Sequence, residues 1–431
     1  MSTLEQAKLA REASIKLATL PAKTKNKALL EIAKSIMKNS KSIINENKKD
    51  IEAAEKSNLN NALIKRLKID EIKIKEMVDE IKSVAKLEDP VGKTISQVEL
   101  DKNLMLYQVT CPIGVIGAIF ESRPDVVTQI SSLCLKSGNA VIMKGGSEAR
   151  NSNRILVKII SEAIEHKGIP REAVQLIETR EQVSEMLKLH EDIDLVIPRG
   201  SNSFVKYVQE NSMIPVLGHS EGICHVYIDK DASLKKAADI SFDAKCQYPA
   251  VCNAMETLIV HRGIAKKFLP QMIKKFKEAN VEIRGDNDTK NIVKNIKTAT
   301  EEDWDAEYND LVLSIKVVNN LDEAIKHINR HSSKHTDAIV TENKKNAETF
   351  MNLVDSASVM WNASTRFADG FRYGKGAEVG ISTSKIHARG PVGLEGLVIY
   401  KYKLIGKGHV VKDYTGKGAK KYTHKIIKKL F

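Results

Sequence analysis

Residues 112–124 read Pro-Ile-Gly-Val-Ile-Gly-Ala-Ile-Phe-Glu-Ser-Arg-Pro. The apolar part of this stretch is typical of a strand buried on both faces, and a charged turn follows it at once. Short apolar runs recur along the chain, separated by segments long enough for helices. They lie at residues 140–143, 173–177, 195–197, 216–217, 224–228, 257–260, 311–318, 338–340 and 358–361. Strands that alternate with helices predict parallel sheets, so we expect an α/β fold.

The length of 431 residues exceeds what one domain usually holds and predicts at least two lobes. Residues 1–90 carry apolar side chains at helical spacing. Residues 94–110 alternate apolar and polar side chains around Asp101-Lys-Asn103, which is the pattern of a hairpin. The apolar runs form two successive sets, and we place the boundary between the two α/β lobes near residues 229–233.

Composition and cysteine usage exclude several classes of protein. The chain is 42% hydrophobic and 29% charged, which is globular composition. No apolar run approaches the ~18 residues of a membrane span, and no secretory signal is visible. Five cysteines without CxxC spacing and eleven histidines without HExxH spacing argue against a disulfide framework and a metal site. We therefore expect a cytoplasmic protein with no membrane partner and no bound metal.

The net charge of +13 is concentrated at the C-terminus. Residues 401–431 hold ten lysines and a single acid, Asp413. Aromatic residues make up only 5% of the chain and do not alternate with the basic ones, as they do in surfaces that stack on bases. We therefore do not expect nucleic-acid binding as the main function. The tail is interpreted as a solvated segment, with a separate salt-sensitive interaction element as the alternative.

Three segments follow predicted strands and carry groups that suit a nucleotide. They are 112–124 with Arg123, 137–148 with Lys144, Gly145 and Ser147, and 197–203 with Arg199, Gly200 and Ser201. Ligands of open α/β sheets lie at the carboxyl ends of the strands, and backbone N–H groups at a helix start bind phosphate. None of the three is a GxGxxG fingerprint, and a glycine-relieved buried strand followed by surface charges is the alternative for each. Together they predict a dinucleotide site in the first lobe.

Among the cysteines, Cys252 is the candidate nucleophile. We expect residues 252–256 to begin a helix, whose N-terminus would lower the thiol pKa, although core packing explains a cysteine there equally simply. Cys134 and Cys224 fall inside apolar runs and are interpreted as inert core thiols. Residues 362–391 are rich in glycine, hydroxyl groups and arginine. This composition suits an anionic substrate, and a solvated loop is the alternative.

The chain resembles the gamma-glutamyl phosphate reductase family of the aldehyde dehydrogenase superfamily. The blocks that carry the resemblance are Pro-Ile-Gly-Val-Ile-Gly from 112, Leu-Lys-Ser-Gly-Asn-Ala-Val-Ile from 135, Ile-Pro-Arg-Gly-Ser from 197, Gly-His-Ser-Glu-Gly-Ile-Cys-His-Val-Tyr from 218, Gln-Tyr-Pro-Ala-Val-Cys-Asn-Ala-Met-Glu-Thr from 247, Asn-Ala-Ser-Thr-Arg-Phe from 362 and His-Ala-Arg-Gly-Pro from 387. The resemblance runs from about residue 4 to 408.

This resemblance implies an aldehyde dehydrogenase-like α/β fold: two Rossmann-like lobes and a small β oligomerisation element. The NADPH-binding domain would comprise 1–93 and 111–229, the catalytic domain 230–385, and the oligomerisation element 94–110 and 386–410. The resemblance does not extend to a basic tail at 411–431, whose role stays open. The resemblance also implies a homo-oligomer, either a dimer or a tetramer.

The implied reaction is NADPH-dependent reduction of L-glutamate 5-phosphate to L-glutamate 5-semialdehyde with release of phosphate, a step of proline biosynthesis. Cys252 would form a thioester with the substrate. Hydrolytic relatives place a glutamate base before a Leu-Gly pair, and this chain has Val216 at that position, which suits a reductase better than the competing hydrolytic aldehyde oxidation. Arg123 replaces the oxyanion-binding asparagine, and we hypothesise that it holds the leaving phosphate.

The remaining site residues are assigned by the same resemblance. The catalytic group comprises Cys252, Arg123 and Asn253. The cofactor-binding group comprises Lys144, Gly145, Ser147, Arg199, Gly200, Ser201 and Glu307. The substrate-binding group comprises Ser364, Thr365, Arg366, Lys385, His387 and Arg389.

Overall fold

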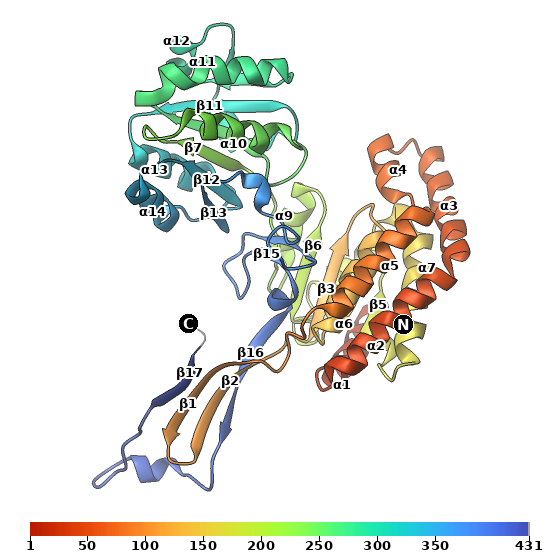
Figure 1. Cartoon of the computed structure of the whole chain (residues 1–431). Coiled ribbons are helices and arrows are strands. Elements are labelled where there is room, and N and C mark those ends of the chain that lie inside the picture. The colour runs from red at the N-terminus through yellow and green to blue at the C-terminus, as the bar shows by residue number, and fades with distance from the viewer. Residues whose placement is uncertain (430–431) are drawn as a thin grey trace.

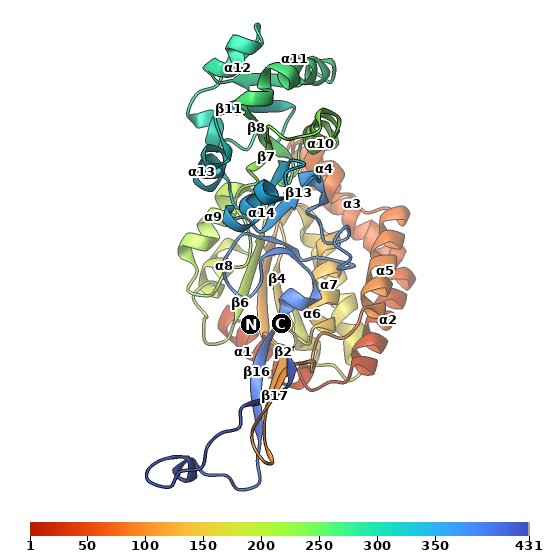
Figure 2. The same ribbon diagram turned by 60° about the vertical axis from the view of Figure 1, so that its left-hand side comes forward.

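The first lobe contains a four-stranded parallel sheet covered by helices on both faces (Figures 1 and 2). The structure is a computed structural model, and its described residues are 1–429. The strand order is β5-β4-β3-β6, with bounds β3 Val115–Phe120, β4 Ala140–Lys144, β5 Val174–Leu176 and β6 Leu195–Arg199. The helices are α1 Thr3–Leu17, α2 Ala22–Lys38, α3 Ser40–Lys56, α4 Asn61–Leu67, α5 Glu71–Lys86, α6 Asp125–Lys136, α7 Arg150–Glu165, α8 Arg180–Met186 and α9 Asn202–Asn211.

The packing of β3 explains why its sequence is an uninterrupted apolar run. Ile116 and Phe120 belong to the core cluster that also contains side chains of α2, α5 and α7, whereas Val115 and Ile119 belong to the cluster under α1 and α8. Successive side chains of a strand point to opposite faces of the sheet. Both faces are covered here, so every position is apolar.

The second lobe contains a seven-stranded parallel sheet of order β10-β9-β11-β8-β7-β12-β13. Its strands are β7 Cys224–Ile228, β8 Met255–His261, β9 Glu282–Gly285, β10 Lys297–Thr298, β11 Val312–Val318, β12 Thr336–Val340 and β13 Ser358–Trp361. Its helices are α10 Leu234–Cys246, α11 Arg262–Glu278, α12 Asn287–Ile292, α13 Leu321–His331 and α14 Lys344–Leu353. The expected α/β fold is therefore confirmed for both lobes.

The position of β7 corrects the expected boundary between the lobes. We placed residues 224–228 in the first lobe, but β7 pairs with β8 and β12 in the middle of the second sheet. The boundary therefore lies before Cys224 rather than at 229–233. The run at 216–217 is also not a full strand, since Val216 forms a single bridge with Val196 of β6.

A long β arm projects from the body of the molecule (Figure 1). It is a four-stranded antiparallel sheet of order β16-β2-β1-β17, formed by β1 Thr94–Asp101, β2 Leu104–Pro112, β16 Val398–Ile405 and β17 Lys425–Lys429. The predicted hairpin at 94–110 is present.

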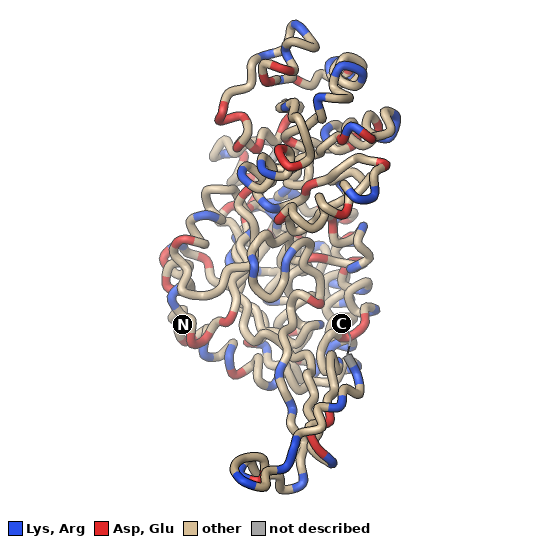
Figure 3. Tube along the Cα trace, turned by 90° about the vertical axis from the view of Figure 1, so that its left-hand side faces the viewer, with Lys and Arg blue, Asp and Glu red and all other residues tan. Residues whose placement is uncertain are grey.

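The C-terminal residues differ from our expectation of a separate basic tail. β17 pairs with β1 as an edge strand, with Val98 opposite Ile426. Figure 3 shows Lys and Arg along the arm. Residues 386–397 also differ from expectation, because Val392, Leu394 and Leu397 pack into the core of the first lobe. The strand that continues into the arm begins only at Val398.

Among the described residues, no helix combines the length and the apolar character that crossing a bilayer requires.

A fully buried ion pair ties α10 to β8. Lys245 Nζ donates to Glu256 Oε2 at 2.5 Å, and neither side chain is exposed to solvent. Removing one partner of such a pair leaves an uncompensated buried charge, so we expect Glu256→Gln to lower the free energy of unfolding by about 3–5 kcal/mol. Urea unfolding measures this loss. In the matched control, Glu278→Gln at the exposed Lys274–Glu278 pair of α11, the change should stay below about 1 kcal/mol. Equal losses in the two variants would contradict the prediction.

Candidate active site

Cys252 lies in the turn that joins α10 to β8. The structure corrects the expectation that residues 252–256 begin a helix, because residues 255–261 form β8. Contacts with the backbone hold the turn in place. Cys224 Sγ donates to the carbonyl oxygen of Cys252 at 3.2 Å. A Cβ at Gly222 would lie 2.3 Å from Cys252 Cα, so a side chain at position 222 would push the turn away.

Cys252 lines a cavity of about 210 Å³ between the two lobes, which we call the Cys252 cavity. Residues from the end of β6 and the start of α9 form one wall, and residues 378–381 contribute to another. Asn202 Nδ2 donates to Glu307 Oε2 at 2.7 Å across the cleft. The cavity therefore brings predicted cofactor residues, Arg199 and Gly200, to the predicted nucleophile.

The environment of Cys252 raises the pKa of its thiol to about 12. Burial is the largest cause, followed by the carboxylates of Glu307 and Glu378, while Arg366 acts in the opposite direction. Burial also raises the pKa of Glu378, whose Oε2 accepts from the Gly370 N–H at 2.8 Å. We expected a helix N-terminus to lower the thiol pKa, and the structure contains no such helix at residue 252. The ligand-free enzyme therefore holds Cys252 as a neutral thiol near pH 7.

This pKa makes a prediction about reactivity. Only the thiolate is alkylated, and its fraction rises about tenfold per pH unit below the pKa. We expect alkylation of Cys252 by iodoacetamide in the ligand-free enzyme to accelerate in this way from pH 7 to 10, as mass spectrometry of the modified peptide would show. Free cysteine, with its pKa of ~8.5, is the control and levels off within the same range. A plateau for Cys252 below pH 9 would mean that the neighbouring arginines already hold a thiolate.

Two arginines lie beside Cys252 without a carboxylate partner. Arg366 is 8% exposed, and its Nε donates to Gln247 Oε1 at 3.0 Å. Arg199 Nη1 donates to Gln129 Oε1 at 2.7 Å. Within the described part of the chain, neither guanidinium has an ion-pair partner within 4.0 Å. Burial lowers the pKa of both, but a guanidinium keeps its charge at neutral pH. These two cations are therefore available to an anionic ligand.

Arg123 lies in a neighbouring cavity rather than in the Cys252 cavity. This second cavity of about 620 Å³ is also lined by Tyr248, Ala250 and Val251, the residues that lead into Cys252. Arg123 Nη2 is 3.2 Å from Asp125 Oδ2, which also binds Lys73 Nζ at 3.2 Å. The predicted phosphate ligand is therefore already engaged with a carboxylate.

Asn253 and the neighbouring loop form a buried polar group next to Cys252. Asn253 Nδ2 donates to the carbonyl oxygen of Ala368 at 2.8 Å. Ser364 Oγ accepts from the Arg366 N–H at 3.3 Å. The Oδ1 of Asn253 and the Oγ1 of Thr365 are buried, and neither has a hydrogen-bond partner among the described residues. Hydrogen bonds thus join the loop that holds Ser364, Thr365 and Arg366 to Gln247 and Asn253, which flank Cys252 in the sequence.

Three predicted substrate residues lie elsewhere. Lys385 Nζ contacts Asp355 Oδ2 at 2.6 Å, and Arg389 Nη1 contacts Asp355 Oδ1 at 2.9 Å. His387 Nε2 is 2.9 Å from the carbonyl oxygen of Gly396. None of the three lines the Cys252 cavity. The structure therefore does not bring these three residues into the Cys252 cavity, and their polar groups bind other residues of the protein.

The predicted nucleotide groups meet at the carboxyl ends of β3 and β4. Lys144 lines two cavities there, of about 280 and 620 Å³, and Ser147 lines both as well. Gly145 lines the smaller one and packs so closely on Asn153 that a Cβ would lie 2.1 Å from its Nδ2. Burial lowers the pKa of Lys144.

An anion already occupies the start of α9. The Ser201 N–H donates to Glu121 Oε2 at 2.9 Å, and a Cβ on Gly200 would lie 2.7 Å from the same oxygen. A carboxylate at a helix N-terminus stands in for the phosphate that such a site binds. The residues present therefore fit a dinucleotide: cationic Lys144, the anion site at Ser201 and the Glu307 carboxylate for ribose hydroxyls.

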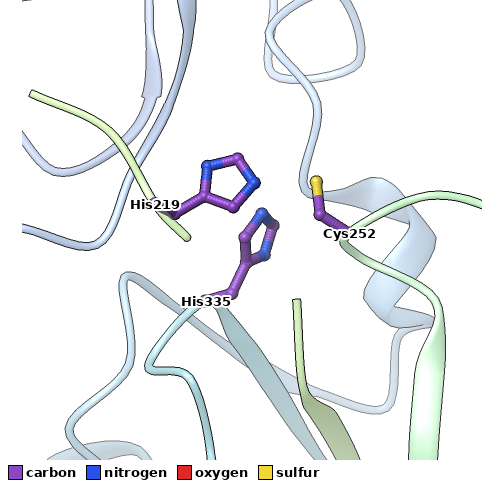
Figure 4. A group of neighbouring side chains, drawn as sticks. All are labelled: His219, Cys252 and His335. Atoms are coloured by element: carbon purple, nitrogen blue, oxygen red, sulfur yellow. The ribbon is translucent and has the colours of Figure 1, made fainter. Parts of the chain in front are cut away.

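The sequence did not point to His219 and His335, whose rings lie close to Cys252 (Figure 4). His219 lines the cavity, and its Nδ1 is 2.9 Å from the carbonyl oxygen of Ile381. No spacing pattern among the histidines could reveal them, since they lie 116 positions apart and meet only in the fold. The one signal in the sequence was their place near predicted strands, since His219 follows the apolar run at 216–217 and His335 precedes the run at 338–340.

The aldehyde dehydrogenase family model matches residues 3–298. Relatives named gamma-glutamyl phosphate reductase include that of Acetivibrio thermocellus, 57% identical over 100% of both chains. That of Methanococcoides burtonii is 58% identical over 97% of this chain and 95% of its own.

Comparison with solved structures points to the same family. The gamma-glutamyl phosphate reductase of Thermotoga maritima is 44% identical, covers 95% of this chain and 100% of its own, and superposes with a TM-score of 0.93. The NADP complex of glyceraldehyde-3-phosphate dehydrogenase GapN from Methanocaldococcus jannaschii, 17% identical over 94% of each chain with a TM-score of 0.63, shares the fold. The chain belongs to the aldehyde dehydrogenase family and, within it, to the gamma-glutamyl phosphate reductases.

Proposed function

We propose that the protein reduces L-glutamate 5-phosphate to L-glutamate 5-semialdehyde, releasing phosphate, in proline biosynthesis. NADPH is the reductant and Cys252 the nucleophile. Full-length identity of 57% to a gamma-glutamyl phosphate reductase supports the reaction. The observation that carries the mechanism is a partly buried thiol in an interlobe cavity, beside two arginines that lack carboxylate partners within the described part of the chain.

Cys252 attacks the acyl carbon, the S–H bond breaks as the carbon–sulfur bond forms, and the thiol proton goes with the departing phosphate. The carbon–oxygen bond to phosphate then breaks, which leaves a thioester on Cys252. In this proposal the Cys252 N–H supports the oxyanion, together with the second N–H of the Asn253 amide, whose first is donated to Ala368. Because the pKa of the thiol is raised, cationic groups such as Arg366 have to favour the thiolate when the substrate reacts.

Arg366 and Arg199 bind the phosphate group. Their forked guanidiniums match phosphate oxygens and neutralise the leaving group. Arg123, the phosphate ligand expected from the sequence, faces the adjacent cavity together with Lys73 and Asp125. There it suits the amino-acid end of the substrate, which carries both an ammonium and a carboxylate.

Lys144, Gly145, Ser147, Gly200, Ser201 and Glu307 hold the dinucleotide. The nicotinamide, when bound, supplies the hydride that reduces the thioester. Glu307 reaches the cleft from the second lobe and is linked to Asn202 of the first.

Hydrolytic aldehyde oxidation is the competing reaction. Val216 occupies the position of the hydrolytic base, and its carbonyl oxygen accepts from Ser384 Oγ at 3.2 Å. A valine cannot activate water, so the thioester persists until it is reduced. The test is NADP⁺ reduction with the semialdehyde as substrate. Turnover must depend on added phosphate or arsenate, and equal turnover without either would contradict the proposal.

Lys144→Ala tests the cofactor preference. An ammonium that binds the 2′-phosphate contributes about 1.5–3 kcal/mol, so we expect the ratio of kcat/KM for NADPH over NADH to fall about 10- to 150-fold. Steady-state kinetics with both cofactors measure this ratio. Equal losses with NADPH and NADH would show that Lys144 does not contact the 2′-phosphate.

The β arm is the element that joins subunits in our proposal. Apolar side chains stand exposed along β16, among them Tyr400, Tyr402 and Leu404, and a second copy would cover them. The protein is then a homo-oligomer, and a monomer in light scattering would contradict this.

All five cysteines are free thiols, which suits the cytoplasm.

A further inference from the structure

His219 lines the Cys252 cavity and His335 is buried close to both His219 and Cys252, and the reaction proposed above gives neither histidine a role. His219 comes from the loop before β7, Cys252 from the turn before β8 and His335 from the residue that precedes β12 (Figure 4). One donor atom from each residue lies within 4.8 Å of the other two. Three segments far apart in the sequence thus place two nitrogens and one sulfur around a single point.

The backbone fixes this arrangement. Gly222, three residues after His219, packs against the Cys252 backbone so closely that no side chain fits there. His335 is fully buried, and its Nδ1 lies 2.8 Å from Thr336 Oγ1. The two rings meet edge to face with centroids 4.9 Å apart. The three donors therefore have little freedom to separate.

The ring nitrogens of the two histidines differ in their present partners. The Nδ1 of His219 faces a carbonyl oxygen, which only accepts, so Nδ1 carries the hydrogen and Nε2 holds the lone pair. The Nε2 of His335 is buried, and it has no hydrogen-bond partner among the described residues. Figure 4 shows both Nε2 atoms on the side of the ring that faces the other labelled side chains. A buried nitrogen without a partner is a cost that a ligand would remove.

We propose that His219, Cys252 and His335 form a binding site for a divalent cation that prefers sulfur ligands, such as Zn²⁺. The bound cation would occupy the sulfur of Cys252 and block its reaction with the substrate. One thiolate and two imidazoles are a ligand set that selects Zn²⁺ over Mg²⁺ or Ca²⁺. Zn²⁺ binds sulfur at ~2.3 Å and nitrogen at ~2.0–2.1 Å, which places tetrahedral donors roughly 3.5 Å apart. The donor atoms now lie within 4.8 Å of one another, so shifts of the side chains by roughly 1 Å would bring them to this separation. Water would fill the fourth position.

Binding is a simple exchange without redox change. The S–H bond of Cys252 breaks, the sulfur–zinc bond forms, and the proton passes to the buffer. The carboxylates of Glu307 and Glu378 favour the cation, whereas Arg199 and Arg366 oppose it. The metal and the acyl phosphate need the same sulfur, so they exclude each other. This inhibitory consequence rests on the proposed function of Cys252, whereas the binding itself does not.

The test measures binding on the full-length protein after metal removal with EDTA and gel filtration. Calorimetric titration with Zn²⁺ should give one site per chain. Loss of an outer-shell partner alone costs 10–100-fold in metal affinity, so His219→Gln, His335→Gln and Cys252→Ser should each weaken binding at least ~tenfold. His190→Gln, on an exposed histidine of the first lobe, is the matched control and should leave the affinity unchanged. Titration with Co²⁺ should give a thiolate-to-cobalt charge-transfer band that Cys252→Ser abolishes.

Absence of Zn²⁺ binding up to millimolar concentration would overturn the proposal, and so would equal affinity in the wild type and the three variants. If the buried His335 variant does not fold, His219→Gln and the cobalt band in Cys252→Ser still decide. None of these measurements needs turnover. A negative result therefore leaves the proposed reductase activity untouched, and loss of that activity would not remove the metal site.

Discussion

Cys252→Ala lowers kcat for reduction of the acyl phosphate by at least ~10⁴-fold, while the Kd for NADPH stays within about threefold of the wild-type value. The size follows from covalent catalysis, because without the sulfur no thioester forms for the cofactor to reduce. Cofactor binding survives because Lys144 and Ser147 line cavities on the first lobe, apart from the Cys252 cavity. Stopped-flow kinetics and fluorescence titration with NADPH measure the two quantities.

The other cysteines of the region provide the control. Cys246 lies at the end of α10, six positions before the nucleophile, and burial raises the pKa of its thiol. Cys224 is fully buried, with its sulfur directed at the Cys252 carbonyl oxygen. Cys246→Ala should therefore keep more than half of the wild-type kcat. Retained turnover in Cys252→Ala together with its loss in Cys246→Ala would transfer the nucleophilic role to Cys246.

The strands that could be predicted from the sequence are the central ones. In β3, β7 and β12 every residue is buried, and the apolar run that covers all of β3 marks the whole strand. In β12 the apolar run covers only residues 338–340, because the strand begins with the buried polar residues Thr336 and Asp337. Which sheet a strand joins is a different matter. β7 is as fully buried as β3, but it enters the second sheet because β8 and β12 flank it. That choice depends on tertiary pairing, which no local pattern contains.

The C-terminal strand and the turn at Cys252 were harder to predict, again because tertiary contacts decide their structure. β17 contains three lysines and is exposed at the edge of the arm, so its composition suggests a solvated tail. Residues 253–256 contain good helix formers, but buried β8 takes Met255 and Glu256 into a sheet, with Glu256 paired to Lys245. Tertiary contacts override propensity at both places.

The residues of the candidate site divide similarly. Cys252, Asn253 and Arg366 were assigned from sequence blocks, and hydrogen bonds between residues 247 and 366 and between residues 253 and 368 bring these blocks together in the fold. Lys385 and Arg389 have the right chemistry, but Asp355 neutralises both, and this partner lies about 30 positions earlier in the chain. A motif identifies which groups are present. Only the fold shows which of them still lack a partner and are therefore free to bind a ligand.

The contrast between Arg366 and Arg389 makes this distinction measurable. Arg366 is buried beside Cys252 with only an amide partner, whereas Arg389 is held by Asp355. A hydrogen bond from a charged donor to phosphate contributes about 1.5–3 kcal/mol, so Arg366→Ala should lower kcat/KM for the acyl phosphate about 10- to 150-fold. Arg389→Ala, the matched control, should change it by less than about threefold.

Rescue experiments show whether Arg366 binds phosphate or has a structural role. Arg366→Lys keeps the charge but loses the fork, so it should recover only part of the loss. Guanidinium ion added to Arg366→Ala should restore activity in a saturable manner, because it refills the vacated place beside the phosphate. Thermal unfolding checks that the variants remain folded. A loss in Arg389→Ala as large as in Arg366→Ala would show that Asp355 releases Arg389 when substrate binds, and that the loop at 385–391 closes over the site.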